Sequence, residues 1–353
     1  PHYIVNVNHY KIMKNNKLYI LYRNCHAFLT FAFFILFTLN SVNGQDDDDK
    51  LIPVKVGHLV ALDMAPLFVG VESGCFEEQG LDVELRFFAN PGDNNAALAG
   101  GSLDFSINPL SLPFFAANSG EPFRVIGSAG GWGIQEVIAQ KELGINSMND
   151  LKDYVESGKK KLSVAVLQGD TLEIIMVTEL KSVGLSTSDV RFVYFNDLFA
   201  MVEAFRSGNV DILSHIKPYT SEMVANGSAS VITNNALAWG VKSPANTIIT
   251  LENTLADRPK LVQSFLKGMK CAAKIINDDP DQAVKLLADN NYFRVPNSAL
   301  KQAFVSAPNP VSFIPDIESV QYVVDELSKM NYISDETAAS DIFRLDMIKS
   351  LEK

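Results

Sequence analysis

The side chains best suited to recognise a small molecule include two tryptophans and a histidine. Trp132 stands between Gly131 and Gly133. A tryptophan flanked by glycines is poorly placed for a core strand, so we expect its ring to line a pocket and stack on a flat solute. Trp239 can do the same or pack at a hinge, and His215 can donate a hydrogen bond to a solute or end a strand. The chemistry these residues offer is noncovalent binding.

Motifs for covalent or metal-dependent chemistry are missing from the sequence. It has no G-x-S-x-G, H-E-x-x-H or P-loop pattern. No set of cysteines and histidines has zinc-site spacing. We therefore predict a protein that is not an enzyme and that needs no metal or cofactor.

The elements that must position these residues begin with residues 54–107. Apolar runs that read as strands alternate there with helical runs, the first of which continues to about residue 78 and ends at Gly80. This order predicts a βαβαβ unit with parallel strands. Ligands bind at the carboxyl ends of such strands, so the first loops to inspect are 60–65, 88–93 and 108–111. The expected strands are 54–59, 81–87 and 103–107, and the second helix is 93–99.

A second unit of the same kind follows. Its expected strands are 162–167, 190–195 and 210–215, separated by helices 172–183 and 198–207. Residues 97–105 and 202–212 share a pattern in which a helix with small residues ends at glycine and an aspartate follows. We also expect strands at 123–128, 230–233 and 247–251, the last returning to the first unit, and residues 135–140 form a further apolar run. The chain beyond it is expected to be helical, at 259–276, 280–287, 297–304, 317–330 and 334–343.

Composition and the amino-terminal region limit where the protein acts. A net charge of −11 argues against nonspecific nucleic-acid binding. Residues 13–44 have a basic start, an apolar core of about a dozen residues and a small-residue end, the design of a secretory signal peptide. Residues 1–12 read as upstream sequence, and 45–53 as an acidic linker, native or engineered. We expect a periplasmic or secreted protein.

Three cysteines occur, and Cys25 lies within the expected leader. Cys75 and Cys271 could form one disulfide, which their spacing cannot decide. Free cysteine is usually a small core residue, which favours two buried thiols. The adjacent Phe114 and Phe115 are expected in the core.

Three segments carry a resemblance to a known family. Residues 74–84 resemble the pattern G-x-F-x-x-x-G-L-x-V-E, residues 97–105 resemble A-L-x-x-G-x-x-D-F, and residues 204–212 resemble A-x-x-x-G-x-x-D. In this order, over residues 54–345, they resemble the type II periplasmic solute-binding proteins of ABC importers. The branch is the one that takes up nitrate, aliphatic sulfonates, taurine and the pyrimidine precursor of thiamine.

The resemblance implies an α/β fold of two lobes, each a mostly parallel sheet flanked by helices, with a helical carboxyl-terminal extension. Lobe 1 would comprise residues 54–140 and 245–353, and lobe 2 residues 141–244. Hinge bending would close the lobes on a small-molecule solute for delivery to ABC permease subunits by a monomeric receptor. The ligand-binding positions it implies are Asp63, Met64, Asn90, Asn108, Gly131, Trp132, Gln168, Gly169, Asp170, Thr171, Asn196, His215 and Trp239. Lys217 is expected at the solvated surface.

One departure from the family concerns the loop 168–171. Anion-binding relatives place Gly, Ser or Thr there, whereas this chain has Asp170, which would oppose an anion. The alternative is that Asp170 only caps its helix. The departure favours a neutral or cationic heteroaromatic solute, held between rings, over nitrate or sulfonate.

Two further functions stay open. An enzyme on the same fold, similar to those that make the thiamine pyrimidine, would resemble this chain in architecture. Such enzymes carry a cysteine-rich iron motif, which this sequence lacks. A secreted sensor that works without a transporter is the other alternative.

Overall fold

The computed structural model describes residues 50–131, 133–240, 242–306 and 311–352. The expected leader, Cys25, the run of four aspartates and Trp132 lie outside the described residues. Within the described residues, no helix is both long enough and apolar enough to cross a membrane.

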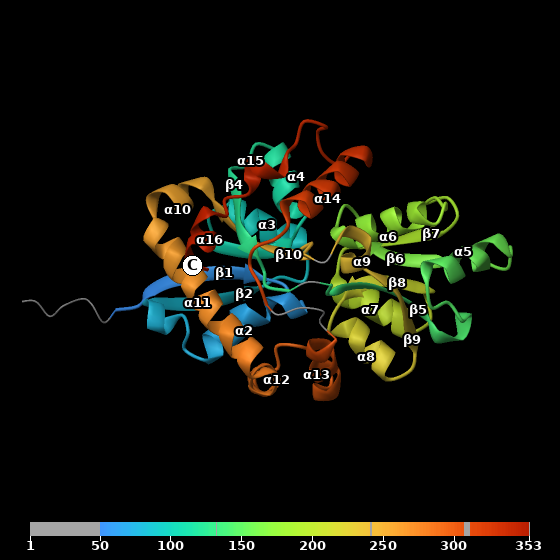
Figure 1. Cartoon of the computed structure of the whole chain (residues 1–353), viewed down its shortest axis with the longest axis horizontal. Helices are drawn as coiled ribbons and strands as arrows, with labels where there is room; N and C mark the ends of the chain where they lie inside the picture. Colours follow the sequence, from blue (N-terminus) through green and yellow to red (C-terminus); the bar gives the residue numbers. More distant parts are fainter. Residues whose placement is uncertain (1–49, 132, 241, 307–310, 353) are drawn as a thin grey trace, which may run out of the picture. The chain divides into compact units, whose positions relative to one another are not determined.

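The first sheet contains the first βαβαβ unit and the expected returning strand (Figure 1). Strand β1 pairs in parallel with β2 and β3, whereas β10 runs antiparallel to β3 and β4. Every residue of β3 is buried, as expected for a central strand. The strand order is β2 (Leu81–Phe87), β1 (Ile52–His58), β3 (Phe105–Pro109), β10 (Asn246–Leu251) and β4 (Phe123–Ser128).

The helices of this unit follow the predicted order with one correction. The helix expected to continue to residue 78 is instead α2 (Ala65–Glu72), followed by a turn and the short 3-10 helix η3 (Glu77–Gln79). Gly74 has a φ of 77°, a left-handed conformation that interrupts a helix. The next helix is α3 (Pro91–Ala99), and α4 (Leu112–Asn118) follows β3.

The second sheet contains the second unit. Strand β6 pairs in parallel with β7 and β8, and helices α6 (Thr171–Ser182) and α7 (Leu198–Arg206) connect them. Strand β5 pairs with β8 and β9, so it belongs to this sheet. The expected boundary of lobe 1 at residue 140 assigned these residues to the first lobe, and this assignment is corrected here by the strand pairing. The strand order is β7 (Arg191–Phe195), β6 (Ser163–Leu167), β8 (Ile212–Ile216), β5 (Gln135–Gln140) and β9 (Ala229–Asn234).

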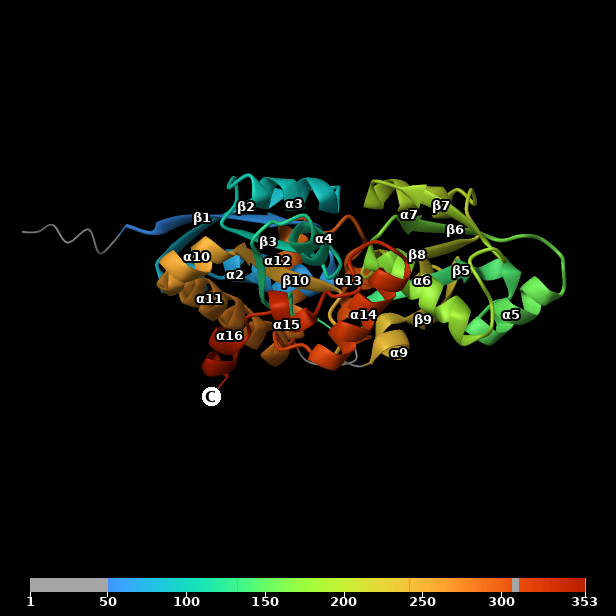
Figure 2. The same cartoon turned by 90° about the horizontal axis from the view of Figure 1, so that it is seen from above.

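The remaining helices cover the sheets and link them. Helix α11 packs against α2, with α10 and α16 beside it (Figure 2). Helix α13 contacts α8, and α14 contacts α6, so carboxyl-terminal helices contact helices that pack on the second sheet. The region expected as helix 334–343 is reduced to the four residues of α15. The remaining bounds are α5 (Met148–Glu156), α8 (Tyr219–Ala225), α9 (Asn235–Trp239), α10 (Glu252–Asp257), α11 (Pro259–Asp278), α12 (Pro280–Asp289), α13 (Asn297–Val305), α14 (Ile317–Lys329), α15 (Ala339–Ile342) and α16 (Asp346–Leu351).

The two cysteines of the described region form a disulfide. The Cα atoms of Cys75 and Cys271 lie 5.8 Å apart, although the two residues are 196 positions apart in the sequence. Cys75 follows α2 and Cys271 lies on α11, and these two helices pack together. The expectation of two free thiols was therefore wrong, because it depended on residue type and not on the helix packing that brings the sulfur atoms together.

Candidate functional site

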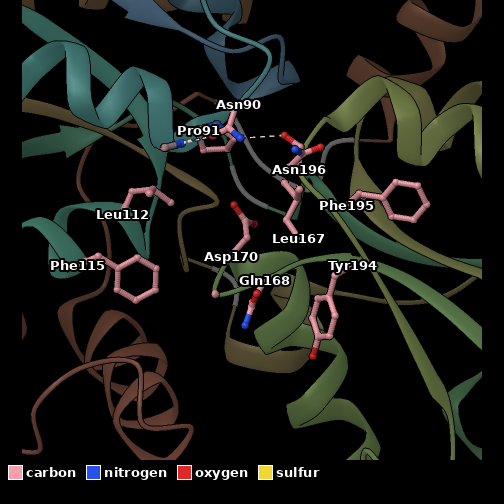
Figure 3. Close-up of a pocket in the computed structure, with 12 residues that line it drawn as sticks. Asn90, Pro91, Leu112, Phe115, Leu167, Gln168, Asp170, Tyr194, Phe195 and Asn196 are labelled. Carbon is pink, nitrogen blue, oxygen red and sulfur yellow. Dashed lines mark hydrogen bonds between the residues drawn. The ribbon is translucent and has the colours of Figure 1, made fainter.

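A cavity of about 590 Å³ is lined by residues from both units. The first unit contributes the start of α3, and α4, which follows this unit, contributes one side. The second unit contributes the ends of β6 and β7 with the loops that follow (Figure 3). The cavity thus lies at carboxyl ends of parallel strands, where α/β sheets bind ligands. The lining residues are Asn90, Pro91, Gly92, Leu112, Phe115, Leu167, Gln168, Gly169, Asp170, Tyr194, Phe195 and Asn196.

Asn90 connects the two halves of the cavity wall. Its side-chain oxygen accepts hydrogen bonds from the backbone N–H groups of Gly92, at 2.7 Å, and Asp93, at 3.4 Å, and so caps α3. Its Nδ2 donates to the backbone oxygen of Asn196 at 3.0 Å (Figure 3). One side chain therefore both orders a helix of the first unit and bridges to the second.

Asp170 is the N-cap of α6 and also faces the cavity. One carboxylate oxygen accepts from the Leu172 N–H at 2.9 Å, which confirms the capping interpretation. The other oxygen, Oδ2, has no hydrogen-bond partner in the described part of the chain. The side chain points toward the middle of the pocket, although the residue is only 4% exposed (Figure 3). Burial raises the pKa of Asp170 to about 6, the bonds from Leu172 and Thr171 oppose the rise, and the charge of Glu173 adds to it.

Glu173, which the sequence analysis did not single out, orders the loop beneath the cavity. Its carboxylate accepts from the Gly169 N–H at 2.6 Å, the Tyr332 hydroxyl at 2.8 Å and the Tyr194 hydroxyl at 2.9 Å. Burial, and then the bond to Glu173, raise the pKa of Tyr194 and raise that of Tyr332 to about 12. Both phenols are therefore neutral donors. The sequence signal was a glutamate three residues after an N-cap aspartate, which by itself indicates only a helix start.

Aromatic side chains form part of the wall. Phe115, expected in the core, lines the cavity instead, whereas its neighbour Phe114 is fully buried in the core. The Phe115 and Tyr332 ring centroids lie 5.8 Å apart. Gly169 has a φ of 71°, and a Cβ on it would lie 3.1 Å from the Phe115 ring. A glycine at this position lets the loop approach the ring closely.

Of the predicted ligand residues, the structure brings together Asn90, Gln168, Gly169, Asp170 and Asn196. Thr171 and Asn108 lie next to lining residues but do not line the cavity. The Thr171 hydroxyl donates to Asp170 and accepts from Gln135, and Asn108 donates to the backbone oxygen of Pro91 at 2.9 Å.

The other predicted residues do not line this cavity. Asp63 accepts from the backbone N–H and the side-chain amide of Asn246, and Met64 is fully buried. His215 contacts the backbone oxygen of Leu198 at 3.0 Å, and burial lowers its pKa to about 4. The Trp239 ring nitrogen donates to Thr178 at 3.2 Å, and Gly131 lies against Asp63. Trp132 is outside the described residues, so its pocket role stays a prediction.

Lys217 corrects another expectation. Its side chain was expected at the solvated surface, but it is 4% exposed and lies 3.3 Å from the carboxylate of Glu136. It also donates to the backbone oxygen of Ser306 at 3.1 Å. Its charge is therefore paired with Glu136.

The lining has a clear electrostatic character. Among its twelve residues, Asp170 is the only one with a charged side chain, and none is lysine, arginine or histidine. The described residues contain no cluster of histidine, cysteine and carboxylate groups that could hold a metal ion. The wall thus offers amide groups, aromatic faces and one carboxylate, a set suited to noncovalent recognition of an organic molecule.

Comparisons with known proteins agree on family and fold. The family model described as NMT1/THI5 like matches residues 61–283. A putative binding protein of Brucella abortus is 28% identical over 246 residues, which cover 67% of this chain and 71% of that protein.

Two solved structures show the same architecture. The alkanesulfonate-binding protein SsuA from Xanthomonas axonopodis pv. citri, bound to MOPS, has a TM-score of 0.71 at 17% identity, over 84% of this chain and 99% of that one. The periplasmic nitrate-binding protein NrtA from Synechocystis has a TM-score of 0.73 at 16% identity, over 85% and 88%. The fold expected from the sequence, that of a type II periplasmic binding protein, is confirmed.

Proposed function

Because the chain belongs to the NMT1/THI5-like family, we propose that it is a receptor that captures a small organic solute in this cavity and delivers it to an ABC-type permease. The fold is that of periplasmic binding proteins, and the proposed receptor binds its solute without transforming it. The single observation that carries the proposal is a cavity whose wall comes from both βαβαβ units.

The arrangement suits closure around a solute. Lobe 1 would comprise residues 54–140 and 245–353, and lobe 2 residues 141–244. One amendment is needed, because β5 is hydrogen-bonded to the second sheet and therefore goes with lobe 2. A molecule that contacts Asn90 on one side and Asp170 on the other stabilises the conformation in which these walls approach each other. The Asn90–Asn196 bond supports the same closed arrangement.

The lining favours a neutral or cationic aromatic solute. Phe115 and Tyr194 offer ring faces, and Asn90, Gln168 and Asn196 offer amide donors and acceptors. A nitrate or sulfonate would meet the carboxylate of Asp170 with no lining cation to offset it.

A location outside the cytoplasm fits two independent features. Residues 13–44 have the pattern of a cleaved signal peptide. The Cys75–Cys271 disulfide is typical of proteins that fold in an oxidising compartment. We propose a periplasmic or secreted monomer whose partners are its solute and the permease subunits, with no role in nucleic-acid binding.

A thermal-shift screen of the purified mature chain tests the proposal. The panel contains aminopyrimidines, nucleobases, flavins, taurine, alkanesulfonates and nitrate. A ligand that binds only the folded state raises the Tm by mass action. Hits are titrated by calorimetry, incubated overnight with the protein and recovered for mass spectrometry. We expect one class to bind at micromolar Kd or tighter and to be recovered unchanged; consumption of the compound would favour the enzyme alternative.

Asn90→Ser provides a matched variant for the location of the site. Serine keeps an N-cap acceptor for α3 but is too short to donate to the Asn196 oxygen, so it breaks the bridge without adding a charge to the lining. We expect affinity for the hit to fall at least fivefold with the Tm of the free protein within about 2 °C. Asn226→Ser, on the exposed end of α8, is the control. Equal affinities of both variants and the wild type would place the solute elsewhere.

A further inference from the structure

The loop after β6 is where an oxyanion would use free backbone N–H groups at the start of a helix. Two of those groups already have partners from the chain itself. The Leu172 N–H donates to Asp170 at 2.9 Å, and the Gly169 N–H donates to Glu173 at 2.6 Å. The carboxylates of Asp170 and Glu173 therefore occupy the place of an anionic ligand.

The carboxylates of Glu173 and Asp170 differ in the number of hydrogen bonds that they accept. Glu173 accepts three hydrogen bonds, from one backbone N–H and two phenols. Asp170 keeps Oδ2 without a donor in the described part of the chain, although the residue is 96% buried and faces the cavity. A buried carboxylate oxygen without a donor is costly, so its retention beside a cavity indicates that a ligand supplies the donor.

Other unpaired acceptors lie directly behind the same wall. Oδ1 of Asn108 and Oε1 of Gln135 have no partner in the described residues, and both side chains are at least 98% buried. Their amide nitrogens are already used, since Asn108 donates to the oxygen of Pro91 and Gln135 donates to Thr171. Around this part of the cavity, unpaired oxygen acceptors thus accompany a carboxylate, and the lining holds no cationic side chain.

From these contacts we infer that the solute presents an ammonium or amidinium group to Oδ2 of Asp170. The receptor then selects small organic cations that carry several N–H donors, and it rejects oxyanions such as nitrate and sulfonates. The aromatic residues Phe115 and Tyr194 contact the remainder of the solute. This inference rests on the proposed receptor function and narrows its ligand to one charge class.

The first arm of the test varies only the charge of the probe. Benzamidinium, benzamide and benzenesulfonate share a ring and differ in the group attached to it, and each is titrated into the mature chain by calorimetry at pH 7.5. We expect benzamidinium to bind at least tenfold more tightly than benzamide, and benzenesulfonate to show no heat of binding. Benzenesulfonate binding as tightly as benzamidinium would overturn the inference.

The second arm varies the protein. Asp170→Asn keeps an N-cap acceptor on α6 but removes the charge, so a role limited to capping would survive it. We expect the affinity for benzamidinium, and for any cationic hit of the solute screen, to fall at least fiftyfold. Asp279→Asn, which changes the exposed N-cap of α12 in the same way, should leave affinity within twofold.

The outcomes separate the inference from the proposed function. A neutral or anionic solute that binds tightly, with an affinity unchanged in Asp170→Asn, would refute the cation preference and leave the receptor function standing. Absence of binding by all three probes and by every compound of the wider screen would refute both.

Discussion

Two buried aspartates, one in each βαβαβ unit, precede the first helix of their unit, and they differ in how their charge is met. Asp63, before α2, receives hydrogen bonds on both oxygens from Asn246, at 2.9 and 3.1 Å. Asp170, before α6, has one oxygen bonded to the helix start and one without a partner in the described residues. Burial raises the pKa of Asp63 to about 7 and of Asp170 to about 6.

The difference separates an aspartate whose acceptors are used within the fold from one that keeps an acceptor at the cavity. The bonds between Asp63 and Asn246 join the loop before α2 to the start of β10, so its acceptors are used within the first sheet region. Asp170 lines a cavity, and its Oδ2 has no donor in the described residues, so we infer that the solute completes its hydrogen bonding there. Residue type and position before a helix are the same, and only the tertiary partner distinguishes the two roles.

The largest expected effect contrasts the two residues in affinity. Asp170→Asn should lose at least fiftyfold in cation affinity, or about 2 kcal/mol, whereas Asp63→Asn should stay within threefold because Asp63 does not line the cavity. Calorimetry with the same cation measures both variants, and circular dichroism checks that each is folded. An equal loss of cation affinity in the two variants would contradict the distinction between Asp170 and Asp63.

The next effect concerns the stability of the free protein. The pKa of Asp170 in the folded state lies above its ordinary value of 3.8, so the unpaired charge costs nothing below about pH 4 and its full amount above about pH 6. Asp170→Asn should therefore be more stable than the wild type by about 3 kcal/mol at pH 8, with the difference falling below about 1 kcal/mol at pH 4. Urea unfolding at the two pH values measures this. A variant less stable than the wild type at pH 8 would mean that the carboxylate is not strained by burial.

The affinity for a cation should rise with pH, whereas the stability of the free wild type relative to Asp170→Asn should fall with pH. Protonation removes the charge that the cation needs, so affinity should fall about tenfold between pH 7.5 and pH 5 for a group with a pKa near 6. The other ionisable groups around Asp170 are Glu173 on α6, Tyr194 on β7 and Tyr332 after α14, and both phenols stay neutral over this range. Titrations of the wild type and Asp170→Asn at both pH values test this. The change of affinity with pH should disappear in Asp170→Asn. If it persists in the variant, another ionisable group causes it.

The smallest effect concerns the support beneath the loop. Tyr332→Phe removes one of three donors to Glu173 and keeps the ring that packs near Phe115. We expect affinity to fall about threefold, below 1 kcal/mol, with the preference for cations over anions unchanged. Tyr322→Phe, an exposed position on α14, is the control. If Tyr332→Phe reversed the preference for cations over anions, Glu173 and not Asp170 would be the residue that sets this selectivity.

Local patterns were enough to predict much of the fold. Both βαβαβ units were read from strand and helix periodicity, because parallel strands with short crossovers leave a regular apolar pattern. The return of β10 to the first sheet was also expected, and its pairing with β3 confirms it. The sheet to which β5 belongs was not predicted correctly. Its partners β8 and β9 are far along the chain, and the local sequence pattern of β5 does not indicate them.

The residues that line the cavity were expected where they lie in loops after strands and were missed where they depend on packing. Asn90, Asp170 and Asn196 follow strands, and this position together with the family resemblance put them among the expected ligand residues; all three line the cavity. Glu173 and Tyr332 meet only in the folded chain, and their sequence gives no sign of it. The Cys75–Cys271 bond was missed for the same reason.

The most direct measurement is a crystal structure of the mature chain with the tightest-binding solute of the screen. We predict that the solute lies in the cavity, touches residues of both units, and places a nitrogen about 3 Å from Oδ2 of Asp170. A solute bound outside this cavity would contradict the proposed site. An oxyanion bound within it, against a displaced Asp170, would contradict the assignment of the ligand.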